Sequence, residues 1–216
     1  MKALVISTHP DDETLGCGGT LLKHNDNRGT CYWLIITEPI SEKKKESRKK
    51  EIENVEKCLN FQQTYELNYP TTKLDEVPRA ELIKNISNII NKVEPEIIFL
   101  PNRSDVHSDH SIVFQAAYSC TKSFRYPFIK KVLMYETLSE TEFAPALPEN
   151  SFTPNYFVDI SEYMEQKIEI MKIYESEVMP DNLPRSISAI RSLAGYRGSR
   201  IGVTYAEAFI MLFEKQ

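Results

Sequence analysis

Residues 3–13 of the chain read ALVISTHPDDE. The first five residues form an apolar run of strand length, and the run gives way directly to a polar stretch that begins at Thr8. A short apolar run bounded by turn residues is typical of a strand that is buried on both faces of a sheet. Residues 2–7 are therefore predicted to form the first strand, with a polar loop at its carboxyl end.

Apolar runs of this kind recur along the chain, and amphipathic stretches separate them. The runs predict strands at residues 2–7, 31–37, 64–67, 96–100, 132–135 and 156–159. The amphipathic stretches predict helices at residues 42–60, 78–93, 111–120, 161–175 and 185–194, and a further helix from residue 20. Residues 205–213 fit either state. The alternation predicts an α/β fold, a doubly wound and mostly parallel sheet with helices on both faces. We expect residues 1–216 to form a single domain.

A second polar cluster follows the fourth predicted strand, where residues 105–110 read DVHSDH. In the doubly wound strand order 3-2-1-4-5, strands 1 and 4 are neighbours, and their outgoing loops flank the crevice where the winding reverses. Both polar clusters lie on these two loops, although they are far apart in the sequence. The topology therefore predicts one active site at the carboxyl ends of strands 1 and 4.

The two clusters contain the side chains that a catalytic metal site needs. His9 and Asp12 of the first loop and His110 of the second offer two imidazoles and a carboxylate, a set that suits Zn²⁺ or another divalent metal. Three protein ligands leave a position for water, whose pKa falls toward about 7 on the metal. Asp11 is then available as the general base.

The second loop also holds His107, three residues before His110. We expect His107 to stabilise an oxyanion or to protonate a leaving amine, with Asp109 orienting its ring. Either cluster alone is also compatible with an ordinary polar turn. Their coincidence on the two switch-point loops favours a site. His24 is expected at the surface or at a helix end.

These motifs resemble those of the PIG-L/LmbE-like family of zinc-dependent N-deacetylases. The resemblance is carried by residues 9–13 with Gly18-Gly19-Thr20, by Asp105-x-His107-x-Asp109-His110, and more weakly by Arg48-x-x-Glu51 and residues 205–209. It implies a Rossmann-like three-layer α/β/α fold. It also implies hydrolysis of an N-acetylated amino sugar or its conjugate, with release of acetate.

The resemblance assigns the same roles to the same residues. It implies that Zn²⁺ is held by His9, Asp12 and His110. Metal-bound water would attack with Asp11 as general base, and His107, backed by Asp109, would stabilise the tetrahedral intermediate.

Two other residues are expected to contact the substrate. Arg48 matches a family position that faces the substrate, and Glu136 ends the fifth predicted strand, from which it could bind sugar hydroxyls. A solvated helix face for Arg48, and helix capping or exposure for Glu136, are the ordinary alternatives. Arg191, Arg197 and Arg200 could meet a phosphate on the substrate, but a loop position is favoured.

Composition limits the partners and the location. With 26 Lys and Arg against 31 Asp and Glu, the formal charge is -5, which argues against nucleic-acid binding. The N-terminal apolar run is too short for a signal peptide or a membrane span, so a cytoplasmic location is expected. The four scattered cysteines predict reduced thiols rather than a disulfide or a cysteine metal site. The expected partner is a small amino-sugar substrate, and a homo-oligomer is compatible with the family.

Two other functions stay open on the sequence. One is an amidase that uses the same metal on a thiol conjugate or a larger acyl amide. The other is a nucleotide-binding module, because residues 16–19 read GCGG. However, Leu21 stands where the dinucleotide motif needs its third glycine. We expect residues 16–19 to form a tight turn against the metal loop.

Overall fold

Seven strands form one sheet in the computed structural model, which describes all 216 residues. The strands are β1 (Lys2–Ser7), β2 (Thr30–Glu38), β3 (Phe61–Pro70), β4 (Ile97–Pro101), β5 (Lys131–Tyr135), β6 (Tyr156–Asp159) and β7 (Ala206–Glu214). Their order is β3-β2-β1-β4-β5-β7-β6. The first five strands pair in parallel, and β7 runs antiparallel to both β5 and β6. The expected order 3-2-1-4-5 is confirmed.

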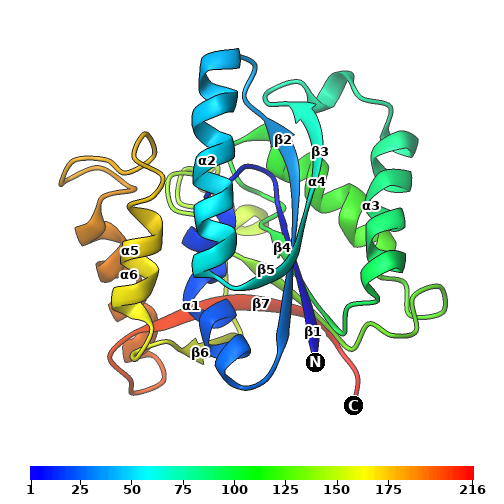
Figure 1. Cartoon of the computed structure of the whole chain (residues 1–216). Helices are drawn as coiled ribbons and strands as arrows, with labels where there is room; N and C mark the ends of the chain where they lie inside the picture. Colours follow the sequence, from blue (N-terminus) through cyan, green and yellow to red (C-terminus); the bar gives the residue numbers. More distant parts are fainter.

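Six α-helices cover the two faces of this sheet. They are α1 (Asp12–Asp26), α2 (Glu42–Cys58), α3 (Arg79–Val93), α4 (Ser108–Tyr118), α5 (Met164–Met171) and α6 (Ile187–Ser199). Helices α1, α2, α5 and α6 lie on one face, and α3 and α4 lie on the other (Figure 1). The expected three-layer α/β/α fold is confirmed. None of the helices is both long and apolar enough to cross a lipid bilayer.

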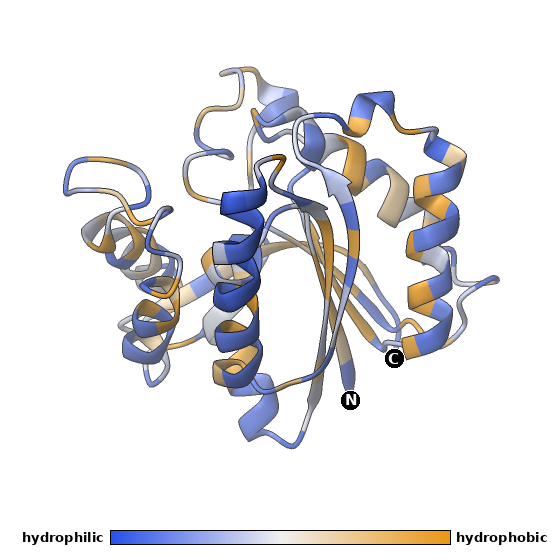
Figure 2. Cartoon of the chain, turned by 45° about the horizontal axis from the view of Figure 1, so that its top comes forward, coloured by the Kyte–Doolittle hydropathy of each residue, from blue (hydrophilic) through white to orange (hydrophobic).

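The strand sequences explain why both faces are covered. In β1, Ala3 and Val5 join the core on the α1 and α2 side, whereas Leu4 and Ile6 join the core on the α3 and α4 side. Side chains alternate across a strand, so a strand that is apolar at every position needs cover on both faces. The central strands are accordingly hydrophobic, and the helices turn their hydrophilic faces outward (Figure 2).

The largest difference from the sequence-based expectation is in α1. Residues 16–19 lie within this helix, at a break marked by the non-helical backbone of Cys17, and do not form the expected tight turn. A Cβ on Gly16 would lie 2.3 Å from the ring of Tyr135, and one on Gly19 would lie 2.8 Å from Ile160. Gly16 and Gly19 therefore allow α1 to pack closely against Tyr135 and Ile160. Because these side chains lie directly against the two glycines, no space is left there for a bound phosphate.

Smaller differences concern element ends. Strand β3 (Phe61–Pro70) is longer than the expected residues 64–67. It is an edge strand, and the polar, exposed residues at its start do not form an apolar run that a sequence pattern would detect. Residues 205–213 fall largely in strand β7 (Ala206–Glu214), which pairs with β5 on one side and β6 on the other. Its apolar side chains join the cores on both faces of the sheet.

Candidate active site

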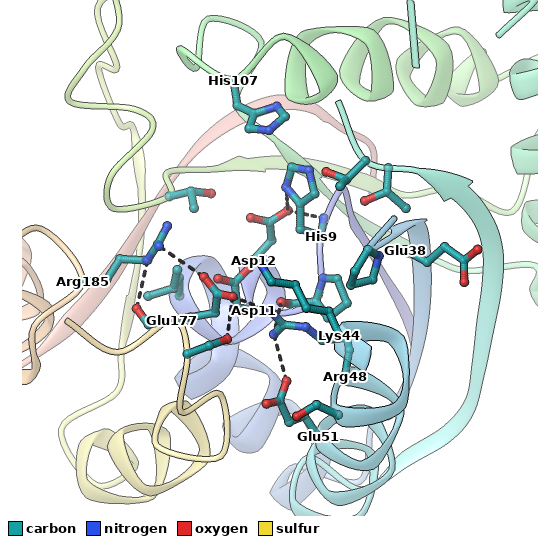
Figure 3. Close-up of a pocket in the computed structure, with 18 of the residues that line it drawn as sticks. His9, Asp11, Asp12, Glu38, Lys44, Arg48, Glu51, His107, Glu177 and Arg185 are labelled. Carbon is teal, nitrogen blue, oxygen red and sulfur yellow. Dashed lines mark hydrogen bonds and ion pairs between the residues drawn. The ribbon is translucent and has the colours of Figure 1, made fainter. Parts of the chain in front are cut away.

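The carboxyl ends of β1 and β4 bring the two polar clusters together, as expected for neighbouring parallel strands. The loop after β1 carries His9 and Asp11, and α1 begins at Asp12. His107 caps the start of α4, which carries His110 in its first turn. These side chains line a cavity of about 550 Å³, which residues of α2 and of the segment after α5 complete (Figure 3).

The turn between β1 and α1 has a strained backbone at Asp11, with φ 132° and ψ -27°. A non-glycine residue adopts such angles only where its surroundings enforce them. Here the Asp11 N–H donates to Glu13 Oε2 at 3.1 Å, and Tyr174 Oη donates to the other Glu13 oxygen at 2.8 Å. Glu13 is fully buried. The hydrogen bond to the buried Glu13 carboxylate therefore stabilises the strained conformation of Asp11.

His9, Asp12 and His110 converge on one point. His110 Nε2 lies 3.3 Å from His9 Nδ1 and 3.5 Å from Asp12 Oδ1, and His9 Nδ1 lies 4.0 Å from Asp12 Oδ2. One ligand atom from each residue falls within 4.8 Å of the others. Two imidazole nitrogens and a carboxylate oxygen at such distances fit the donor set of a divalent cation.

The second nitrogen of His110 is held by Asp105, whose Oδ2 lies 2.8 Å from Nδ1. Asp105 in turn accepts from Asn102 Nδ2 at 2.7 Å and from Thr141 Oγ1 at 2.6 Å. A carboxylate in this position orients a metal-binding histidine and raises the basicity of its free nitrogen. Burial alone would lower the pKa of His110, but the charge of Asp12 and the hydrogen bond to Asp105 outweigh it and raise that pKa to about 9. The carboxylates around His110 therefore favour a positive charge at its ring, either a proton or a bound cation.

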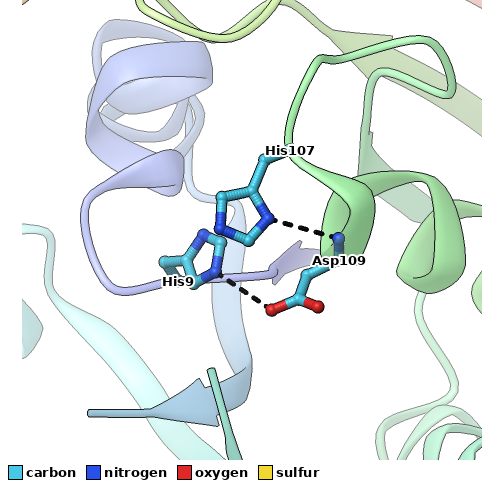
Figure 4. Close-up of side chains that lie close together, drawn as sticks. All are labelled: His9, His107 and Asp109. Carbon is cyan, nitrogen blue, oxygen red and sulfur yellow. Dashed lines mark hydrogen bonds and ion pairs between the residues drawn. The ribbon is translucent and has the colours of Figure 1, made fainter. Parts of the chain in front are cut away.

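A second cluster that could hold a metal shares His9 and adds His107 and Asp109 (Figure 4). His9 Nε2 lies 3.6 Å from Asp109 Oδ2, too far for a hydrogen bond, and has no other partner. The Asp109 carboxylate accepts instead from the Thr72 N–H at 2.7 Å. We favour the set with Asp12 and His110, because only there does a buried carboxylate hold the outer nitrogen of a ligand histidine.

The contact between Asp109 and His107 differs from the expected one. The backbone N–H of Asp109 donates to His107 Nδ1 at 3.2 Å, while its carboxylate faces His9. Asp109 therefore orients the His107 ring through its main chain, because His107 is the N-terminal cap of α4.

Asp11 is a buried residue that lines the cavity, and the charges of two arginines act on its carboxyl group. Burial raises the pKa of Asp11 well above its usual range; the charges of Asp12 and Glu177 raise it further, and Arg48 and Arg185 oppose them. The raised pKa brings the carboxyl group nearer to the range that a general base needs.

Arg48 lines the cavity as expected, but its guanidinium already has protein partners. It donates to the Pro10 carbonyl at 3.3 Å and pairs with Glu51 at 3.1 Å and with Glu177. Arg48 therefore also fixes the loop that carries the metal-binding residues.

Glu136 does not line the cavity, contrary to its expected contact with sugar hydroxyls. Both of its carboxylate oxygens bind Arg197, at 2.8 and 2.6 Å. Arg191 similarly binds both carboxylate oxygens of Glu165. Both arginines belong to α6 and not to the expected loop. Glu136, Arg191 and Arg197, which the sequence offered for substrate contacts, are therefore engaged in ion pairs within the protein.

The span of the chain that holds both loops matches a known family. A model of the PIG-L family, described as GlcNAc-PI de-N-acetylase, matches residues 4–121. The chain belongs to the PIG-L family. Membership confirms the expected enzyme class, an N-deacetylase that hydrolyses an amide bond.

Relatives of this PIG-L protein cover nearly all of it. It is 27% identical to the diacetylchitobiose deacetylase of Thermococcus kodakarensis over 95% of this chain and 81% of the relative. The N,N'-diacetylchitobiose deacetylase of Pyrococcus horikoshii superposes with a TM-score of 0.77 at 25% identity, over 98% of this chain and 83% of that one. A conserved protein from Thermus thermophilus superposes with a TM-score of 0.80 at 25% identity, over 99% and 96% of the two chains.

The PIG-L protein also places residues in the cavity that the motifs did not reveal. Glu177 and Arg185 come from the segment between α5 and α6, and Glu140 comes from the loop after β5. None of the three belongs to a recognisable spacing. Asp105 differs, because its place in the second cluster is a signal that sequence reasoning could have used.

Proposed function

We propose that this protein is a zinc-dependent hydrolase that removes the N-acetyl group from an N-acetylated amino sugar or its conjugate, releasing acetate. The convergence of His9, Asp12 and His110 beside Asp11 carries the proposal. The relatives named for diacetylchitobiose support a small sugar substrate, and a cavity of about 550 Å³ is of a size that takes one. In this proposal residues 1–216 act as a single catalytic domain.

The metal would be held by His9, Asp12 and His110. When bound, a divalent cation polarises the amide carbonyl and makes water more acidic near neutral pH. Zn²⁺ suits the two imidazoles and one carboxylate, although other divalent ions bind such sets as well. The ring nitrogens of His9 and His110 that face each other need a cation or a proton between them, which supports this assignment.

Asp11 is proposed to accept the proton of the attacking water. Its carboxylate lines the same cavity as the metal-binding set, and Glu13 and Arg48 fix the turn that presents it. Adjacent residues on a strained turn point in different directions, so Asp12 can bind the metal while Asp11 faces the water.

His107 is proposed to donate a hydrogen bond to the oxyanion that forms on the amide carbonyl. Burial, followed by the neighbouring His9 and His110, lowers the pKa of His107, so its ring is neutral near pH 7. Its Nδ1 accepts the Asp109 N–H, which leaves the ring proton on Nε2 as a donor. Electrostatic stabilisation of this kind is often a large term in amide hydrolysis. Asp11 and His107 are the two groups placed to protonate the leaving amine.

Two variants test the proposal, with acetate release and bound zinc as separate readouts. Asp11→Asn should keep the metal and slow turnover by about 10²-fold or more, because it removes the general base. His110→Ala should lose both metal and activity. His24→Ala removes a histidine outside the cavity and serves as the control. An unchanged rate for Asp11→Asn, or wild-type zinc content in His110→Ala, would refute the assigned roles.

The substrate is tested by measuring acetate release from N-acetylglucosamine, N,N'-diacetylchitobiose and nucleotide-linked N-acetyl sugars, against thiol conjugates and longer acyl amides. Turnover of the sugars supports the proposal, whereas turnover of the longer amides alone supports an amidase. A cytoplasmic location and a homo-oligomer stay predictions, to be checked by cell fractionation and by light scattering.

A further inference from the structure

Helix α1 is broken one turn after the residue that begins it. Cys17 has φ -148° and ψ 16°, so a short helical segment from Asp12 to Gly16 meets the rest of the helix at a kink. In an unbroken helix, Gly19 N–H would bond to the Leu15 carbonyl and Thr20 N–H to the Gly16 carbonyl. At the kink these main-chain N–H and carbonyl groups therefore need other hydrogen-bond partners inside the protein.

A buried ion pair supplies those partners. Glu207 of β7 accepts the N–H of Gly19 at 2.9 Å and that of Thr20 at 2.7 Å, one on each carboxylate oxygen. Lys167 of α5 donates to the Leu15 carbonyl at 2.8 Å. Lys167 and Glu207 also bind each other at 2.6 Å, and both side chains are 4% exposed. The pair thus replaces hydrogen bonds on both sides of the break.

The charges have the signs that the two helix ends favour. The carboxylate of Glu207 lies at the N-terminal end of the second segment, where the helix dipole favours negative charge, and the ammonium of Lys167 lies at the C-terminal end of the first, where it favours positive charge. Two ordinary apolar side chains would fill the same space but leave the main-chain groups without partners, which is costly in a buried site.

The first segment also carries one member of the metal-binding set, Asp12. It begins at Asp12, and Leu15, whose carbonyl Lys167 holds, lines the active-site cavity. We propose that Lys167 and Glu207 are positioning residues, which fix the angle of the first segment of α1 and so hold Asp12 in reach of His9 and His110. This inference rests on the proposed metal site.

The test measures the affinity for Zn²⁺, by competition with a chelator, and the visible spectrum of the Co²⁺-loaded protein, which reports ligand geometry. The main variant is Lys167→Met with Glu207→Gln, because removing both charges leaves no stranded ion in the interior. The glutamine can accept one of the two α1 N–H groups but not both. We expect Zn²⁺ to bind at least tenfold more weakly and the Co²⁺ spectrum to change.

The control is Glu165→Gln with Arg191→Met, which removes the exposed ion pair between α5 and α6 and leaves α1 unchanged. It should bind Zn²⁺ like the wild type. Lys167→Met alone is the second variant, for the case in which the double variant does not fold. Glu207 then keeps both N–H donors of α1 and its place at a helix N-terminal end, although its carboxylate loses its counter-charge. The same tenfold loss is expected for it.

The outcomes separate this inference from the proposed function. If the wild type binds no Zn²⁺ with these residues, the proposed metal site itself fails. If the wild type binds Zn²⁺ and a folded Lys167→Met or double variant shows the same affinity and the same Co²⁺ spectrum, the pair is purely structural and the positioning role is refuted.

Discussion

At the scale of single residues, the two ring nitrogens of His110 have different partners, and this makes metal binding depend on pH. Without a metal, His110 keeps a proton up to a pKa of about 9, because Asp12 and Asp105 favour its charged form. A metal ion must displace that proton. The apparent affinity for Zn²⁺ should therefore rise about tenfold per pH unit between pH 7 and pH 9 and then level off.

A chelator competition titration at several pH values measures this slope. Asp105→Asn removes one of the charges that raise the pKa of His110, so its affinity should level off at a lower pH than that of the wild type. A wild-type affinity that does not change between pH 7 and pH 9 would contradict the protonation state described for His110.

The chemical types of the site residues were predictable, but their contacts were not. His9, Asp12 and His110 could be named because the sequence shows two things. Their side chains are of metal-binding types, and they follow two strands that are predicted to be neighbours. The carboxylate of Asp109 turns to Thr72, and that of Glu136 turns to Arg197. The partner of each carboxylate depends on which residue the folded chain brings close to it. No spacing between residues in the sequence predicts that partner.

At the scale of elements, the packing of α1 against the sheet requires glycine at position 16. The Tyr135 ring, which is fully buried and donates to the Ile6 carbonyl at 2.9 Å, occupies the space beside Gly16. Gly16→Ala should therefore lower the free energy of unfolding by about 1–3 kcal/mol, as overpacking does elsewhere. Chemical denaturation with urea measures this change.

Gly18→Ala in the same helix is the matched control. A Cβ there would be 3.6 Å from its nearest neighbours, an ordinary contact, so alanine should be neutral or stabilise by up to about 1 kcal/mol. Equal effects of the two substitutions would show that helix propensity, and not packing against Tyr135, decides the outcome.

The same helix shows where element prediction ends. Glycines at residues 16–19 indicate a turn when they are read alone, because glycine disfavours helix. The helix continues past them because the partners that close the break, Lys167 and Glu207, come from elements that follow much later in the chain. Long-range partners of this kind override local propensity.

At the scale of the whole molecule, the two apolar cores determine which thiols can react. Burial raises the pKa of Cys31 to about 12 and also raises the pKa of Cys17 and Cys120, whereas Cys58 is exposed at the end of α2. Only the thiolate reacts readily, so a thiol reagent should modify one cysteine in the native protein and all four in the denatured chain.

A thiol reagent with a chromophore counts the reactive groups at pH 8, and Cys58→Ser should leave the native protein unreactive. Rapid reaction of a second thiol in the native state would mean that one of the cores opens more easily than its packing indicates.

The overall topology was predictable because the apolar runs and their alternation with helices fix a parallel sheet. The antiparallel edge formed by β7 and β6 was not, because residues 205–213 fit either state by pattern alone. Their pairing with β5 is decided by the core that β7 completes, in which Phe209 is fully buried.

The central claim concerns where the cation binds, and anomalous diffraction at the zinc absorption edge tests it most directly in crystals grown with Zn²⁺. We predict one strong peak with His9, Asp12 and His110 each about 2.0–2.2 Å away. A peak held instead by His9, His107 and Asp109, or no peak at either cluster, would contradict the account.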